Sequence, residues 1–197
     1  MRLGEGLAAV VGVVGLGALM GCQPDFSDRS RGVEATFDDG RGTVTRASGV
    51  VTPSGQHNLS VIVDQRYCDA STDELVQRSV YAQGYSPGPD PTVEVRVSPD
   101  LEEASARLQV EANVVTQRWD GCDADPASEP ASEHRGSVEV RAQLEWVGTG
   151  DLRQDRSGVD LRDAVAEGVV RVDAPVGKIR LAPSDDAQLQ AFEGIEE

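Results

Sequence analysis

Residues 106–114 read ARLQVEANV and residues 138–146 read VEVRAQLEW. In both stretches every second residue is apolar, and the residues between are polar or charged. A period of two places the apolar side chains on one face of a β-strand and the polar ones on the other. Both stretches therefore predict strands of a sheet with one face on a core and the other in water.

Shorter stretches repeat this alternation along the chain. They are residues 33–37, 59–63 and 93–97, with weaker candidates at 44–45, 50–51, 76–80, 169–172 and 179–181. Gly- and Pro-containing turn sequences separate them. Many short strands with such turns are typical of an antiparallel sandwich or of a sheet closed on itself. We predict an all-β fold, an antiparallel β-sandwich of about 7–10 strands.

Two segments near the carboxyl end favour short helices. Residues 160–167 place Leu161 and Val165 one turn apart and are followed by a glycine, which commonly stops a helix. In residues 184–192, Ser184 can cap a helix that carries two aspartates in its first turn. We expect one or two short helices here beside the sheet.

The amino terminus, residues 1–22, reads MRLGEGLAAVVGVVGLGALMGC. Arg2 precedes an apolar stretch that ends at Met20 and is shorter than the roughly 20 residues that a membrane-spanning helix needs. It closes on Leu19, Met20, Gly21 and Cys22. This ending resembles the lipobox of bacterial lipoproteins, in which an aliphatic residue at the third position before an obligatory cysteine is combined with a small residue directly before it.

The resemblance implies that residues 1–21 are a signal peptide and that Cys22 becomes the lipidated first residue of the mature chain. It implies a location outside the cytoplasm, on the bacterial cell membrane, since two acyl chains suffice for stable anchoring. The alternatives are an ordinary secretory signal and an uncleaved anchor. We interpret the polar residues 22–32 as a tether and residues 33–197 as one ectodomain, long enough to bury a core.

Cys68 and Cys122 are the cysteines left once Cys22 is lipidated. An even pair in an oxidising compartment favours a disulfide. Each follows a β-rich run and a Gln-Arg-aromatic sequence, so each lies just beyond a strand end. Closing so long a loop contributes about 4 kcal/mol in the chain-entropy model. We predict a Cys68–Cys122 disulfide, with a free reactive thiol as the alternative.

The composition narrows the classes of partner. The formal net charge is −16, and so acidic a surface repels nucleic acid, which we therefore exclude as a partner. Aromatic residues make up only 4% of the chain. Carbohydrate-binding surfaces and protein hot spots rely on exposed aromatic side chains, and few are left here once the core takes its share.

No catalytic or cofactor-binding motif stands out. The chain lacks Gly-x-Ser-x-Gly, Ser-x-x-Lys, His-Glu-x-x-His and Cys-x-x-Cys sequences, and it has only His57 and His134. Asp120, Asp123 and Asp125 are weak candidates for a metal site, because hard cations take clustered carboxylates. A polar turn beside the disulfide explains the same residues. We expect no cofactor and no enzymatic activity.

These features favour a membrane-anchored, non-enzymatic binding or accessory module with the membrane itself and a protein of the cell envelope as partners. Residues 123–136, rich in Pro, Ser and Glu, are interpreted as an exposed loop between two long strands and as a first place to look for a site. The alternatives are a lipoprotein that binds a small ligand or a cation, and an envelope hydrolase.

Overall fold

The alternating stretches are strands in the computed structural model, which describes residues 24–88, 90–173 and 176–193. Within these residues nine strands follow one another, and no helix is long and apolar enough to cross a membrane. The strands are β1 Ser30–Asp38, β2 Thr43–Val51, β3 His57–Asp69, β4 Glu74–Ser86, β5 Val93–Val97, β6 Glu103–Asp120, β7 Ser132–Gln154, β8 Asp160–Val172 and β9 Gly177–Phe192.

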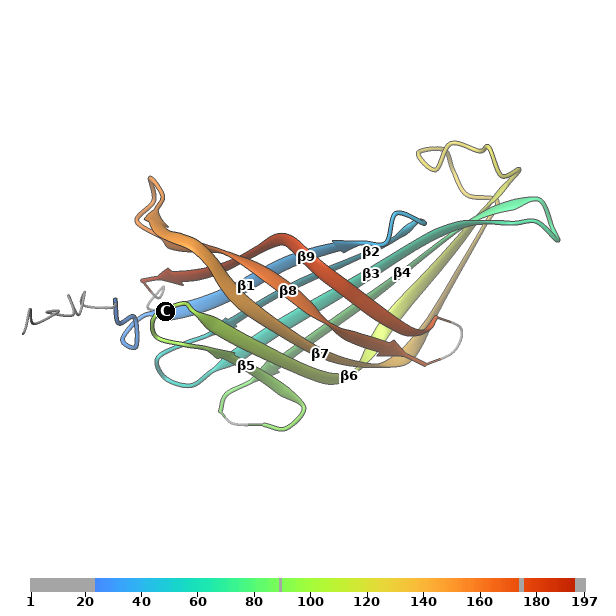
Figure 1. The fold of residues 1–197 in the computed structure, drawn as a ribbon. Helices are drawn as coiled ribbons and strands as arrows, with labels where there is room; N and C mark the ends of the chain where they lie inside the picture. The colour runs from blue at the N-terminus through green and yellow to red at the C-terminus, as the bar shows by residue number, and fades with distance from the viewer. Residues whose placement is uncertain (1–23, 89, 174–175, 194–197) are drawn as a thin grey trace, which may run out of the picture.

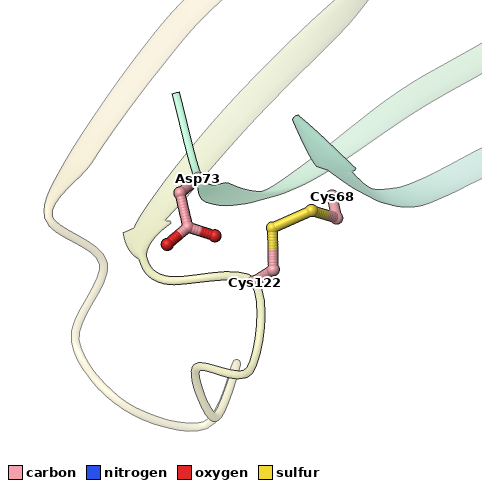
Figure 2. A group of neighbouring side chains, drawn as sticks. All are labelled: Cys68, Asp73 and Cys122. Atoms are coloured by element: carbon pink, nitrogen blue, oxygen red, sulfur yellow. A yellow bond between two sulfur atoms is a disulfide. The ribbon is translucent and has the colours of Figure 1, made fainter. Parts of the chain in front are cut away.

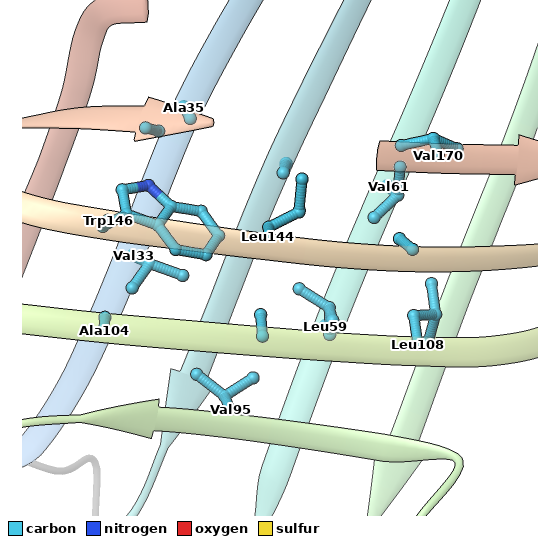
Figure 3. Close-up of a cluster of buried hydrophobic side chains, with 14 of the residues drawn as sticks. Val33, Ala35, Leu59, Val61, Val95, Ala104, Leu108, Leu144, Trp146 and Val170 are labelled. Atoms are coloured by element: carbon cyan, nitrogen blue, oxygen red, sulfur yellow. The ribbon is translucent and has the colours of Figure 1, made fainter. Parts of the chain in front are cut away.

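All nine strands belong to one antiparallel sheet in the order β4-β3-β2-β1-β9-β8-β7-β6-β5 (Figure 1). The first and last strands pair with each other, and a further ladder joins β4 to β6. Strands β1 to β4 therefore face β6 and β7 across the core, as Figure 3 shows. The predicted all-β, antiparallel fold is confirmed, and the number of strands lies within the predicted range.

The core fills the space between these two halves. Leu59, Leu108, Leu144 and Leu189 are fully buried, and each such side chain stabilises the fold by roughly 1.5–3 kcal/mol. Trp146 on β7 is buried as well, and its Nε1 donates to a backbone oxygen of β1 at 3.0 Å. The interior of the closed sheet is thus packed with apolar side chains (Figure 3).

The two predicted carboxyl-terminal helices are wrong, because residues 160–167 lie in β8 and residues 184–192 lie in β9. The inward residues of these strands include Ala164, Ala166 and Ala187, all buried at a spacing that fits a strand. Because alanine also has the highest helix propensity, the strand-like alternation of these residues is hard to recognise in the sequence. Pairing with neighbouring strands decides the conformation.

Strand β5 occupies the gap that opens where β4 and β6 separate, and among the described strands it pairs with β6 alone. Its other edge is covered by side chains from the interior. His57 Nδ1 lies 3.0 Å from the backbone oxygen of Val95 and 3.1 Å from its nitrogen, and Arg31 donates to Val97 O at 2.7 Å. These contacts occupy an edge that would otherwise pair with other chains.

The predicted tether is shorter than expected at its carboxyl side. Strand β1 begins at Ser30, inside the predicted range 22–32. Phe26 packs into the core, and its backbone nitrogen donates to Pro99 O at 2.8 Å. The predicted signal peptide, residues 1–21, and Cys22 lie outside the described residues.

Strands β3, β4, β6 and β7 run on past the rest of the sheet and form a projection, which we call the arm (Figure 1). It comprises residues 66–77 and 113–137, which are paired through β3–β4, β4–β6 and β6–β7. The start of β1 pairs with the end of β9, so both lie at the other end of the molecule. The fold therefore separates the arm from the side where the chain enters.

Candidate functional site

The tip of the arm is held by the disulfide between Cys68 and Cys122, whose Cα atoms are 5.2 Å apart (Figure 2). Cys68 lies opposite Leu75 in the β3–β4 ladder, and Leu75 lies opposite Trp119 in the β4–β6 ladder. The three side chains therefore share one face of the arm. The structure joins the two cysteines that the sequence predicts to pair.

A loop, residues 121–131, folds over this face. Trp119 is only 3% exposed, and its Nε1 donates to Ser128 O at 3.0 Å. Leu75 is buried beside it, so the loop covers a small apolar cluster outside the main core. The predicted exposed loop 123–136 is shorter than expected, because β7 already begins at Ser132, in register with Arg118 on β6.

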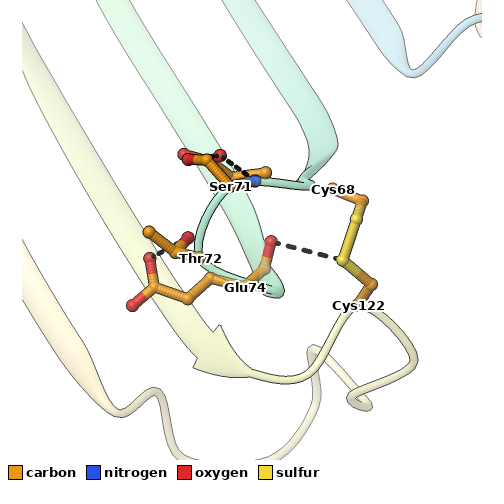
Figure 4. Close-up of a disulfide and its surroundings, with 6 residues drawn as sticks. Cys68, Ser71, Thr72, Glu74 and Cys122 are labelled. Carbon is orange, nitrogen blue, oxygen red and sulfur yellow. Dashed lines mark hydrogen bonds between the residues drawn. A yellow bond between two sulfur atoms is a disulfide. The ribbon is translucent and has the colours of Figure 1, made fainter.

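Polar contacts reinforce the tip (Figure 4). Glu74 accepts hydrogen bonds from Arg118 Nη1 at 2.7 Å and from Thr72 Oγ1 at 2.9 Å. The bond from Arg118, followed by the one from Thr72, lowers the pKa of Glu74 below its ordinary value. Asp69 accepts from the hydroxyl and the backbone nitrogen of Ser71, which lowers the pKa of Asp69 as well.

One group of three metal-type ligands occurs among the described residues, formed by Cys68, Asp73 and Cys122 (Figure 2). Both sulfur atoms are bonded to each other, and a metal needs them as thiolates. Only the Asp73 carboxylate stays available in the oxidised protein. In the oxidised protein this group therefore acts as a structural disulfide that has the Asp73 carboxylate beside it, and it does not offer three metal ligands.

The sequence-derived metal candidates Asp120, Asp123 and Asp125 are not part of such a group within the part of the chain that the structure describes. Asp125 Oδ1 instead accepts the backbone N–H of Ala127 at 2.9 Å, and its backbone oxygen accepts from Ser128 Oγ at 2.6 Å. Asp125 thus shapes the loop that covers Trp119. A cation site on these aspartates stays a prediction.

The two histidines lie apart. His57 is buried at the start of β3 against β5, whereas His134 is exposed on the arm opposite Thr116. The oxidised Cys68–Cys122 pair leaves neither histidine a thiol to activate. Among the described residues, the hydrogen-bond contacts of His57 are with the backbone of Val95.

A different surface has the character of a binding site. The outer faces of β9, β1, β2, β3 and β4 form a shallow hollow of about 540 Å³, continuous with a second one of about 390 Å³. Glu34 is the only charged residue that lines the larger hollow. The second hollow shares Glu34 with the larger one and is also lined by Arg46 and Asp186. We call the larger hollow the neutral groove. Its serine, amide and glycine residues are Gly32, Ser48, Gly49, Asn58, Ser60, Gln83 and Gln190.

Aromatic side chains border the neutral groove. Tyr81 and Phe192 line it, and Tyr85 lies opposite Asn58 in the β3–β4 ladder at its margin. Tyr81 is 46% exposed and Tyr85 is 60% exposed. Both tryptophans and the other two phenylalanines are buried. The few aromatic residues that the core leaves over are thus concentrated here, apart from Tyr67 on the arm.

The outer face of β6 and β7 has the opposite character. Arg107, Glu111, Glu139, Arg141 and Glu145 point outward there, and Arg141 pairs with Glu139 at 2.7 Å. Charged side chains of both signs are therefore more frequent on this face than in the larger hollow. Sequence reasoning missed the neutral groove, although the outward residues of 58–62 and 81–85 contain no charge.

No protein-family model, no curated protein and no solved structure matches the chain.

Proposed function

We propose that the protein is a lipid-anchored, extracytoplasmic binding module that recognises a component of the cell envelope through the neutral groove. The observation that carries this proposal is the groove itself, in which Glu34 is the only charged residue among the described residues that line it. It combines exposed Tyr81 and Tyr85 with small polar side chains on a chain of net charge −16. Exposed aromatic side chains in a weakly charged patch, surrounded by a charged surface, are typical of recognition sites.

The position at which the amino-terminal segment joins the sheet supports a tethered module. Phe26 is packed into the core only four residues after Cys22, so a lipid on Cys22 would hold the body of the sheet close to the membrane. The arm extends from the opposite end (Figure 1). Strand β6 alone has 18 residues, which corresponds to about 60 Å. The neutral groove then faces sideways, parallel to the membrane surface, between anchor and arm.

The chemistry of the neutral groove supports binding over hydrolysis. Acid–base hydrolysis of a glycoside needs two carboxyl groups on opposite sides of the scissile bond. Glu34 is the only carboxylate among the described residues that line the larger hollow, and Asp186 lines only the second hollow. The disulfide removes Cys68 and Cys122 from nucleophilic chemistry. The favoured function is therefore recognition without turnover.

The experiment is site-specific photo-crosslinking in intact cells. A photoreactive benzophenone amino acid replaces Tyr85 in one strain and Gln143, which is exposed on the charged face of β7, in a matched strain. We expect a reproducible adduct from position 85 only. The adduct should disappear in a Cys22→Ala background, because the module is then no longer held at the membrane.

Two results would count against the proposal. Equal adducts from positions 85 and 143 would mean that the neutral groove has no special role. An adduct at neither position, in cells where both variants are folded and exported, would remove the groove as a recognition site.

A further inference from the structure

Hydrogen-bonding capacity is concentrated in the centre of the neutral groove. Ser48, Asn58 and Ser60 point outward from β2 and β3. Neighbouring side chains are hydrogen-bonded to one another, as in the pairs Arg46–Asp64 and Tyr81–Gln83. Among the described residues, no side-chain hydrogen bond involves Ser48, Asn58 or Ser60. Their hydroxyl and amide groups are therefore free to bind a ligand.

A ligand in the neutral groove can be recognised only by side chains. Strands β1, β2 and β3 are paired along both edges, so their backbone groups are engaged in ladders. An extended peptide that adds a strand needs an open edge, and the groove has none. The ligand must match side-chain hydroxyls, amides and aromatic rings.

A serine hydroxyl both donates and accepts, and an amide carries one group of each kind. Sugar hydroxyl groups have the same double capacity. Carboxylates and guanidinium groups have only one of the two roles, and Glu34 is the only one of either kind in the larger hollow. The polar side chains of the groove thus match an uncharged polyhydroxylated ligand.

The aromatic rings are spaced for a chain and not for a single sugar. Tyr81 and Tyr85 lie four residues apart on β4, which corresponds to roughly 13 Å along the strand. Phe192 lies at the other margin, four strands away, or about 19 Å. The hydroxyl of Tyr81 donates to Gln83 Oε1 at 2.8 Å, which holds the ring in position. Aromatic rings at these positions offer apolar faces on which the C–H faces of successive sugar rings can stack.

From these observations we propose that the neutral groove binds an uncharged polysaccharide chain of the cell envelope or its surroundings. This inference rests on the proposed function, because it names the ligand class of the same groove. The net charge of −16 disfavours anionic polymers. The centres of protein–protein interfaces are enriched in aromatic residues, arginine and methionine and depleted in serine. The larger hollow shares the aromatic residues, but it has two serines and neither arginine nor methionine among the described residues that line it.

The test is affinity electrophoresis of the mature full-length protein, extracted from membranes in mild detergent. Native gels contain one dissolved neutral polysaccharide each, namely a β-glucan, a xylan, a galactomannan or a dextran, and a parallel gel contains anionic alginate. We expect retardation by at least one neutral polymer and none by alginate. Tyr85→Ser should weaken the retardation about tenfold, the change expected when one aromatic stack is lost.

Two variants serve as controls. Tyr85→Phe keeps the ring and should retain binding, whereas Gln143→Ser on the charged face should leave it unchanged. Because Tyr85 is largely exposed, an unchanged melting temperature checks that each variant is folded.

The proposal is overturned if no neutral polymer retards the protein, or if Tyr85→Ser binds as tightly as the unaltered chain. If position 85 still crosslinks a protein in cells, the binding module stands and its ligand is a protein. If position 85 captures nothing, the proposed function fails together with the ligand.

Discussion

His57 covers the free edge of β5 by contacting both backbone polar atoms of Val95, whose nitrogen and oxygen lie 3.1 Å and 3.0 Å from Nδ1. The neutral ring accepts the N–H of Val95 when Nδ1 carries no proton, and it donates to the oxygen when Nδ1 is protonated. One buried side chain thus compensates for a missing neighbouring strand. This hydrogen bond stabilises the fold because the edge of β5 is buried, where an unpaired backbone group would have no water to bind.

Replacing this histidine should therefore destabilise the fold. His57→Leu leaves the N–H of Val95 buried without an acceptor, which costs about 1–3 kcal/mol. Urea denaturation followed by circular dichroism measures the loss. His134→Leu is the matched control, because His134 is exposed on the arm and its replacement should change stability by less than about 0.5 kcal/mol. Equal stabilities of the two variants would refute the role of His57 at this edge.

Reduction of the disulfide should open the arm and leave the main core intact. The loop that covers Trp119 begins at Gly121, directly before Cys122, so loss of the crosslink frees it. We expect reductant to increase the acrylamide quenching of about one of the two tryptophans, since Trp146 stays in the core. A Cys68→Ser/Cys122→Ser variant should behave like the reduced protein with or without reductant. Unchanged quenching would contradict the clamp.

Acid should loosen the same region. The folded pKa of Glu74 is depressed by Arg118 and Thr72, and that of Asp69 is depressed by Ser71. A carboxyl group with a depressed pKa stabilises the fold fully above its unfolded pKa, and this contribution is lost as the pH falls through the folded value. The arm should therefore be insensitive to pH between 7 and 5, and Trp119 should become accessible to quencher below about pH 4.5.

A substitution at the ion pair separates this effect from general acid unfolding. Arg118→Gln removes the main cause of the depressed pKa of Glu74, so Trp119 should become accessible at a higher pH than in the unaltered chain. Arg153→Gln breaks an exposed pair with Asp163 far from the arm and should leave that pH unchanged. The same pH for all three proteins would show that Glu74 does not hold the arm.

Gly84 on β4 packs directly against Val93 of β5 and Leu108 of β6. A Cβ at this position would lie 2.4 Å from Val93 Cγ2 and 2.7 Å from Leu108 Cδ1. Gly84→Ala should thus cost about 1–3 kcal/mol by overpacking. Gly136→Ala on the arm is the control, because its Cβ would meet only Val114, at 3.5 Å, and should be tolerated. Thermal unfolding compares the two, and a tolerated alanine at position 84 would contradict the close packing of β5.

Much of this fold is predictable from local alternation. The period of two in residues 106–114 and 138–146 correctly identifies which side chains of β6 and β7 face the core. It fails in β8 and β9, where inward alanines combine high helix propensity with a weak apolar signal. The ladders between β1 and β9 and between β4 and β6 join residues distant in sequence, and no local pattern encodes them.

The candidate site was less accessible to sequence reasoning than the disulfide. The pairing of Cys68 and Cys122 could be predicted because they are the two cysteines left besides Cys22 and because similar sequences precede them. The neutral groove takes two or three residues from each of five strands, so it can be located only once the register of the sheet is known. The scarcity of aromatic residues argued against such a surface, because composition does not show where Tyr81 and Tyr85 are placed.

A charge placed in the neutral groove tests the central claim most directly. Gln83→Glu introduces a carboxylate on β4, among the residues that line the groove, and Gln143→Glu makes the same change on the charged face. The measurement is the amount of crosslinked envelope component that co-purifies with each variant from intact cells. The account predicts loss of the component with Gln83→Glu and full retention with Gln143→Glu. Equal retention by both variants would contradict recognition through the neutral groove.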